Sequence, residues 1–193
     1  MKILNRSLAS LSLLSILLTS SVFASDSAGI SGSVTTLGND AVQKHIELKK
    51  GWNLVGVNAA LTLDELKSKL GNDNILVING QGGIYKKGSA RVSFKKFEQG
   101  KGYYIKLESA KGFDYTPISY ADKTIPLIEG WNRVNPITEL TLPEIKNQLG
   151  DSLLFINGGD GTRYKVNGRS NFTKFTEPYG YMIKVSQNST LQF

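Results

Sequence analysis

The 193-residue chain contains no cysteine and one histidine, and none of its apolar runs approaches the roughly 20 residues that span a bilayer. The lack of cysteine excludes disulfides, thiolate zinc sites, cysteine nucleophiles and the lipid anchor of bacterial lipoproteins. One histidine excludes a histidine-rich metal centre and argues against a catalytic triad built on histidine. We therefore expect a protein that folds by its apolar core alone and carries no metal and no cofactor.

The composition is that of a folded protein with a basic surplus. Hydrophobic residues make up 40% of the chain, and 23 Lys and Arg face 16 Asp and Glu, for a net charge of +7. This apolar content is too high for a disordered chain. A basic surplus can attract anionic partners, but no nucleic-acid-binding motif accompanies it, so nucleic acid is not expected as a partner.

Residues 1–24 have the pattern of a secretory signal peptide. Lys2 and Arg6 supply its positive start, Leu8–Leu18 the apolar segment, and 22–24 (VFA) the small-residue cleavage pattern. The apolar segment is about half as long as a membrane span. We expect a mature chain that begins at Ser25 and is extracytoplasmic, either periplasmic or secreted, with no transmembrane span after cleavage.

The remainder of the chain repeats itself. Residues 51–55 (GWNLV) recur as 130–134 (GWNRV), and 102–106 (GYYIK) recur as 180–184 (GYMIK), with further matches in the same order between them. Ordered agreement of this kind indicates a tandem duplication. The sequence predicts the following organisation: a flexible lead-in at 25–45, repeat unit 1 at 46–113, a linker at 114–123 and repeat unit 2 at 124–193.

Each unit contains the start signal of a helix. Thr62 and Glu65, and again Thr141 and Glu144, have the spacing of a capping box, in which the threonine and the glutamate satisfy each other's backbone N–H groups. This structural role accounts for both glutamates without catalysis. Short apolar or alternating runs surround the helices. Two more strands are expected in each unit, around Phe94/Phe97 and Tyr103/Ile105 in the first and around Phe172/Phe175 and Tyr181/Ile183 in the second. The predicted fold class is α+β: two tandem homologous units, each a small, mostly antiparallel sheet with one short helix.

Aromatic residues offer two interpretations. Trp52 and Trp131 could stack against sugar rings, but their places in apolar strands favour burial between strand and helix. We therefore assign both a structural role. Tyr103, Tyr104 and Tyr179 follow glycine, proline or each other near a strand start and could equally line a binding rim or pack inside.

Basic residues crowd one stretch of unit 1. If they gathered on one face they could meet an anionic polysaccharide, but solvated strand edges explain them slightly better, since lysine at an edge discourages sheet aggregation. The candidate residues are Lys86, Lys87, Arg91, Lys95 and Lys96.

Residues 51–56 (GWNLVG), followed by 100–105 (GKGYYI), resemble the GWNLVG…GxGYWI modules found in tandem in bacterial secreted and cell-surface proteins. The resemblance covers both units, 46–193. Unit 2 departs from it, because Arg133 stands for Leu54 and Asn135 for Gly56. The resemblance implies an extracytoplasmic accessory or binding module and no particular reaction.

Export, duplication and the lack of a nucleophile–base constellation favour a non-enzymatic binding or adhesion protein, whose partner is an anionic surface glycan or another envelope or surface protein. One alternative is a polysaccharide-acting enzyme with carboxylates at the cleft between the repeats, drawn from Asp114, Asp122, Glu139 and Asp160. Another is a structural component or secreted effector of a surface assembly, which a large exposed apolar patch would favour.

Overall fold

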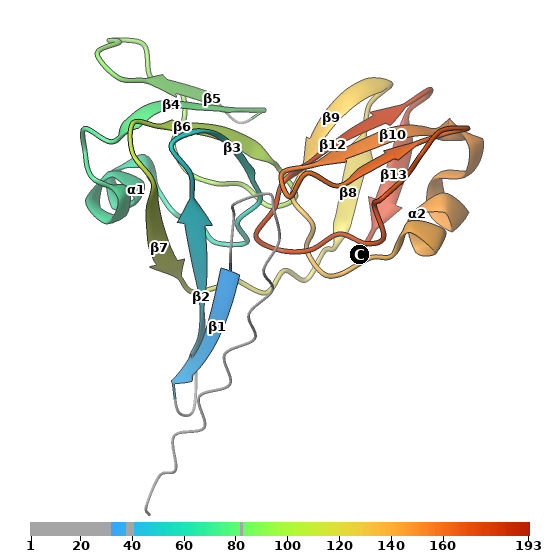
Figure 1. Cartoon of the computed structure of the whole chain (residues 1–193), viewed down its shortest axis with the longest axis horizontal. Helices are drawn as coiled ribbons and strands as arrows, with labels where there is room; N and C mark the ends of the chain where they lie inside the picture. The colour runs from blue at the N-terminus through green and yellow to red at the C-terminus, as the bar shows by residue number, and fades with distance from the viewer. Residues whose placement is uncertain (1–31, 38–40, 82) are drawn as a thin grey trace, which may run out of the picture.

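The computed structural model describes residues 32–37, 41–81 and 83–193, and folds them into antiparallel sheets with two short α-helices (Figure 1). This agrees with the expected α+β class. The predicted signal peptide, 1–24, lies outside the described residues. The elements are β1 (Gly32–Leu37), β2 (Ala41–Leu48), β3 (Gly51–Val55), α1 (Leu63–Leu70), β4 (Ile75–Gly80), β5 (Gly83–Lys86), β6 (Tyr103–Leu107), β7 (Lys111–Tyr115), β8 (Thr124–Leu127), β9 (Gly130–Val134), α2 (Leu142–Leu149), η1 (Gly150–Ser152), β10 (Leu153–Gly158), β11 (Arg163–Lys165), β12 (Tyr181–Val185) and β13 (Ser189–Gln192).

Two four-stranded sheets lie side by side, with α1 and α2 at the two outer sides of the molecule (Figure 1). Their strand orders are β3-β6-β4-β5 and β9-β12-β10-β11. Strand β2 pairs with β7, and β8 pairs with β13. Each four-stranded sheet is therefore accompanied by a strand pair, formed by the strand before its first strand and the strand after its last inner strand in the chain. We call β2–β7 the N-terminal unit and β8–β13 the C-terminal unit.

The expected lead-in contains regular structure. Within 25–45, residues 32–37 form β1 and residues 41–45 begin β2. Strand β2 continues to Leu48 because Ile46 and Leu48 alternate into the core and pair with β7. Strand β2 thus runs across the predicted boundary between 45 and 46.

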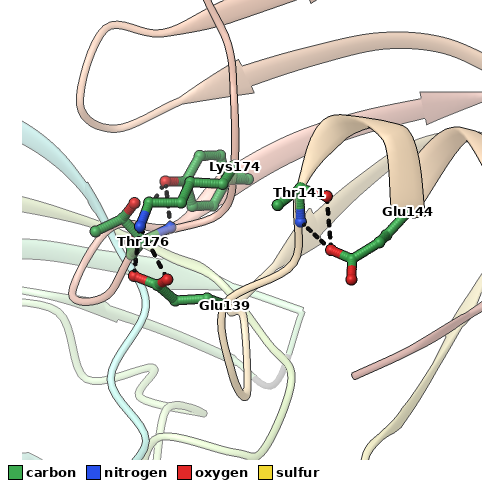
Figure 2. Close-up of polar contacts among 6 residues, drawn as sticks. Glu139, Thr141, Glu144, Lys174 and Thr176 are labelled. Carbon is green, nitrogen blue, oxygen red and sulfur yellow. Dashed lines mark hydrogen bonds and ion pairs between the residues drawn. The ribbon is translucent and has the colours of Figure 1, made fainter.

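Both helices begin at the predicted threonines. Thr62 and Thr141 donate their backbone N–H groups to the Glu65 and Glu144 carboxylates, each at 2.7 Å. Figure 2 shows this contact at the start of α2. These hydrogen bonds from the threonines lower the pKa of both glutamates. The capping roles are confirmed. No described helix is long and apolar enough to cross a membrane.

Each unit buries its own apolar cluster beneath its sheet. In the N-terminal unit, Phe94 and Phe97 contact Tyr103 edge-on, with ring centres 5.5 and 4.9 Å away. The strand expected around these phenylalanines is wrong, because residues 88–95 have no strand. Residues three apart in a strand point to opposite faces, whereas both rings enter the same cluster. The segment around Phe172 and Phe175 behaves in the same way.

The burial expected for the tryptophans is wrong. Trp52 is 55% exposed and Trp131 is 48% exposed. The neighbouring asparagines point inward instead, because their amides satisfy turn backbone: Asn53 accepts from Lys49 N–H and donates to its carbonyl, both at 2.9 Å. Asn132 makes the same pair of bonds with Ile128. Side chains alternate along a strand, so each inward asparagine directs its tryptophan to solvent.

Backbone hydrogen bonds join the two units reciprocally. The N–H groups of Gly56 and Gly180 donate to the carbonyls of Pro178 and Leu54, at 2.9 and 3.1 Å. On the other side, Asn135 N–H donates to Gly100 and Gly102 N–H to Arg133, at 2.9 and 3.2 Å. Each unit thus covers the free edge strand of the other, β3 or β9.

The first prediction concerns the cap of α1. Thr62→Ala should lower the free energy of unfolding by about 1 kcal/mol, because it removes the Thr62 hydroxyl that accepts from Glu65 N–H at 3.3 Å. Chemical denaturation measures the change. Ser68→Ala removes a hydroxyl from the middle of the same helix and should be neutral or slightly stabilising. Equal losses in both variants would contradict the capping role.

The second prediction concerns the junction. A Cβ added at Gly180 would lie 2.6 Å from the Val55 carbonyl oxygen, so Gly180→Ala should cost about 1–3 kcal/mol by overpacking. Gly168→Ala is the control, because its Cβ would meet only the flexible Lys165 side chain, at 3.3 Å. Denaturant unfolding compares the two. A Gly180→Ala protein as stable as the Gly168→Ala protein would contradict the close approach.

Candidate functional site

The two four-stranded sheets each turn one face largely to solvent, although Leu54 on the face of the N-terminal unit is buried. Strand register aligns the side chains of these faces into rows of four. In the N-terminal unit the rows are Trp52–Lys106–Val77–Lys86 and Leu54–Tyr104–Asn79–Ile84; in the C-terminal unit they are Trp131–Lys184–Phe155–Lys165 and Arg133–Met182–Asn157–Arg163. Among these described residues, aromatic and basic side chains recur and none is acidic.

Each exposed tryptophan has a lysine over its ring. Lys106 Nζ lies 5.6 Å from the centre of the Trp52 ring, and Lys184 Nζ lies 5.9 Å from that of Trp131. Both distances are within the range of cation–π attraction. A second aromatic side chain meets each tryptophan edge-on: Tyr104 at 6.1 Å and, in the C-terminal unit, a phenylalanine at 5.5 Å.

Arg133 connects the two solvent faces. Its guanidinium lies 5.5 Å from the centre of the Tyr104 ring and donates to the Asn79 side chain and carbonyl, at 2.9 and 3.1 Å. Since Arg133 belongs to β9 while both partners belong to the N-terminal unit, the two faces form one continuous surface. We call this the aromatic–basic surface.

Two hollows open on the aromatic–basic surface. The first, about 210 Å³, lies at the junction, where Trp52, Leu54 and Tyr104 face 157–159 of the C-terminal unit. The second, about 440 Å³, lies beside the β10–β11 hairpin. Asn157 lines both, so the two hollows adjoin.

The predicted tyrosines separate into three environments. Tyr104 lies on the aromatic–basic surface. Tyr103 is completely buried, and burial raises its pKa to about 12, so its assignment to a binding rim is wrong. Its side chain fills the core because it alternates with Tyr104 along β6. Tyr179 is partly buried and packs against the apolar clusters of both units.

The predicted basic residues do not form one patch. Lys86 lies on the aromatic–basic surface, whereas Lys87 forms ion pairs with Asp73 and Glu108, at 3.1 and 4.0 Å. Lys95 and Lys96 lie beside the first turn of α1, where Lys96 forms a β-bridge with the cap residue Thr62 and the Lys95 carbonyl accepts from Leu63 N–H. Arg91 is exposed in the loop after β5.

The carboxylates considered for a cleft each have a different partner. Glu139 pairs with Lys174 at 2.8 Å (Figure 2), and Asp114 contacts His45 at 2.5 Å. Asp160 accepts from Thr162 and Tyr181, and Asp122 from Thr124. Across 32–37, 41–81 and 83–193, no three His, Cys, Asp or Glu residues are grouped so as to hold a metal ion.

Three residues that give the aromatic–basic surface much of its charge were not predicted from the sequence: Arg133, Lys106 and Lys184. A signal for the lysines was present, because both units keep the pattern Gly-Tyr-x-Ile-Lys. In a strand, that lysine faces the same side as the residue after the tyrosine. Arg133 carried no such signal, since its partners Asn79 and Tyr104 lie on two strands of the other unit, β4 and β6.

Comparisons of the chain with protein-family models, with curated proteins and with solved structures found no match.

The third prediction concerns His45, which lies between two carboxylates. Partial burial lowers the pKa of His45, but hydrogen bonds to Glu47 and Asp114 outweigh it and raise that pKa above the usual 6.5. A raised pKa stabilises the fold below the unfolded-state value, and this stabilisation is lost as pH rises through the folded-state value. The stability of the parent relative to His45→Gln should therefore be constant well below the unfolded-state pKa of about 6.5 and fall as pH rises above it.

Denaturant unfolding at several pH values measures this difference. Asp114→Asn removes one of the two carboxylates and should make the pH dependence shallower. A difference between the parent and His45→Gln that stays constant or grows with pH would contradict the proposed charge contacts.

Proposed function

We propose that this chain is an exported, non-enzymatic binding protein that holds a polysaccharide on the aromatic–basic surface. The observation that carries the proposal is the exposure of Trp52 and Trp131 on adjoining sheet faces, each with a lysine over its ring. Single exposed apolar side chains are common on protein surfaces, but two exposed indoles on one surface with further aromatic neighbours form a group, and such a group supports a binding role.

The chemistry of the surface suits a sugar polymer. The face of an indole packs against the C–H face of a pyranose ring, and exposed asparagine side chains such as Asn157 both donate to and accept from hydroxyl groups. Two tryptophans on one continuous surface offer two such platforms to a chain molecule. Binding at both raises the affinity above that of either platform alone.

We further propose that the two units arose by duplication and that the protein acts outside the cytoplasm. The repeated GWNLV/GWNRV and GYYIK/GYMIK segments and the equal strand orders of the two sheets support duplication. The charged start, apolar segment and cleavage pattern of 1–24 support export. Duplication and export both agree with the resemblance to tandem modules of bacterial surface proteins. An adhesive role at the cell envelope agrees with that resemblance too.

The fourth prediction separates binding from structure. Trp52→Ala and Trp131→Ala should each weaken polysaccharide binding about tenfold or more while lowering the free energy of unfolding by at most about 1 kcal/mol, as expected for exposed side chains. Affinity electrophoresis against immobilised polysaccharides measures the binding. Because the chain has two tryptophans, the emission of each single variant reports on the tryptophan that remains.

Ile118→Ala is the matched control, because Ile118 is 43% exposed but belongs to neither the rows nor the hollows. It should bind as the parent does. A parent protein that binds no neutral or acidic polysaccharide would overturn the proposed function, and a loss of several kcal/mol in both tryptophan variants would return these residues to a structural role.

A further inference from the structure

We propose that the second hollow is an anion subsite, in which Arg163 and Arg169 bind the carboxylate or sulfate groups of an acidic polysaccharide. This inference rests on the proposed function and names the ligand class. The hollow measures about 440 Å³ and is lined by Asn157, Gly161, Arg163, Arg169, Ser170 and Asn171. Guanidinium groups bind carboxylate and sulfate oxygens through pairs of parallel hydrogen bonds.

The hollow is built by hydrogen bonds that tie a loop to β11. Arg163 N–H donates to the Asn171 side chain at 2.7 Å, and the Arg163 carbonyl accepts from Asn171 N–H at 3.0 Å and Phe172 N–H at 3.1 Å. Ser170 Oγ donates to the same carbonyl, also at 3.1 Å. These bonds hold the segment that carries Arg169 against the strand that carries Arg163, so both arginines line one concavity before any ligand arrives.

Neither arginine is neutralised by a described acidic residue. The ion pairs of residues 41–81 and 83–193 include neither Arg163 nor Arg169. The nearest acidic residue in sequence, Asp160, instead accepts hydrogen bonds from the hydroxyl and N–H of Thr162, at 2.6 and 2.9 Å. Two exposed like charges that share a concavity repel each other, and a bound anion relieves that repulsion.

The corresponding place in the N-terminal unit lacks the charge of Arg163. Arg91 stands where Arg169 does, two residues before the Ser93 that corresponds to Asn171. Strand register aligns Ile84 with Asn79 as it aligns Arg163 with Asn157. Ile84 N–H donates to the Ser93 hydroxyl as Arg163 N–H donates to Asn171. Ile84 is 44% exposed and apolar, so the same local architecture is retained without the guanidinium. The basic hollow is therefore a feature of the C-terminal unit and not a requirement of the fold.

The position of the anion subsite favours a polysaccharide over a nucleic acid. Because Asn157 lines both hollows, a chain whose acidic group binds the arginines can place a neighbouring ring against Trp52 and Tyr104. The Asn157 amide between them can both donate and accept, which suits sugar hydroxyls. Phosphodiester oxygens only accept, so a nucleic-acid backbone would use this amide less completely.

The test compares polygalacturonate with its fully methyl-esterified form, in which the same sugar chain has lost its carboxylate charge. The parent should bind the acid more tightly than the ester, and salt should weaken binding of the acid only. Arg163→Gln/Arg169→Gln should bind the acid about 10- to 100-fold more weakly, the loss expected for hydrogen bonds to a charged group. Its binding of the ester should not change.

Two controls complete the test. Lys95→Gln/Lys96→Gln removes the same charge beside α1 and should bind the acid as the parent does, and melting curves establish that each variant is folded. Ile84→Arg places a guanidinium at the corresponding position of the N-terminal unit and should strengthen binding of the acid but not of the ester.

Each result decides between the proposals. A parent that binds neither polymer nor any other polysaccharide overturns the proposed function. A parent that binds acid and ester equally, or a double arginine variant that binds the acid as the parent does, overturns the anion subsite alone. Tighter, arginine-dependent binding of a single-stranded oligonucleotide than of polygalacturonate would overturn the acidic polysaccharide in favour of nucleic acid.

Discussion

The reciprocal backbone pairing between the two units is the constraint on which the rest of the structure depends. Strands β3 and β9 lie at the edges of their sheets, and each edge is covered by the segment that precedes an inner strand of the other unit. An uncovered edge would invite aggregation, and covering it fixes how the units sit. Only with this pairing does Arg133 reach Tyr104 and Asn79, so the continuity of the aromatic–basic surface follows from hydrogen bonds that contain none of its side chains.

The junction is symmetric in its backbone but not in its side chains. Asn135 donates to Asn58, which in turn donates to the Glu177 carboxylate, itself paired with Lys44. Burial of Lys44 lowers its pKa, as expected when an ammonium group leaves water. Gly56 faces Asn135 across the junction, and a Cβ there would lie 2.3 Å from the Asn135 oxygen. One unit therefore supplies the polar side chain and the other the space for it, which makes the two units non-interchangeable.

Local features of the fold could be predicted from the sequence, whereas those set by contacts between distant segments could not. The capping boxes depend on residues three apart, and both formed as expected. The tryptophans were misassigned because hydrophobicity alone was used to predict burial. It does not account for a neighbouring residue whose side chain makes hydrogen bonds on the inward side of the strand. Asn53 takes the inward position, since an amide that satisfies turn backbone at both ends stabilises the turn. The arginine hollow needs the loop around Asn171 to return to β11, which no local pattern indicates.

The two units share the strand order of their sheets and differ on their solvent faces. The strand residues that point into the core, the helix caps and the turn asparagines are nearly the same in both units, because changing them would lower the stability of the fold. The solvent rows carry no such constraint, and there the units diverge: Leu54 against Arg133, and Ile84 against Arg163. Both exchanges place positive charge in the C-terminal unit. In the N-terminal unit Leu54 is buried, whereas Ile84 is 44% exposed and leaves apolar surface. A ligand that lies across the junction would therefore meet an apolar, aromatic side and a cationic side. Under the proposed function, these two different environments would let the surface distinguish the direction of a polymer chain as well as its charge.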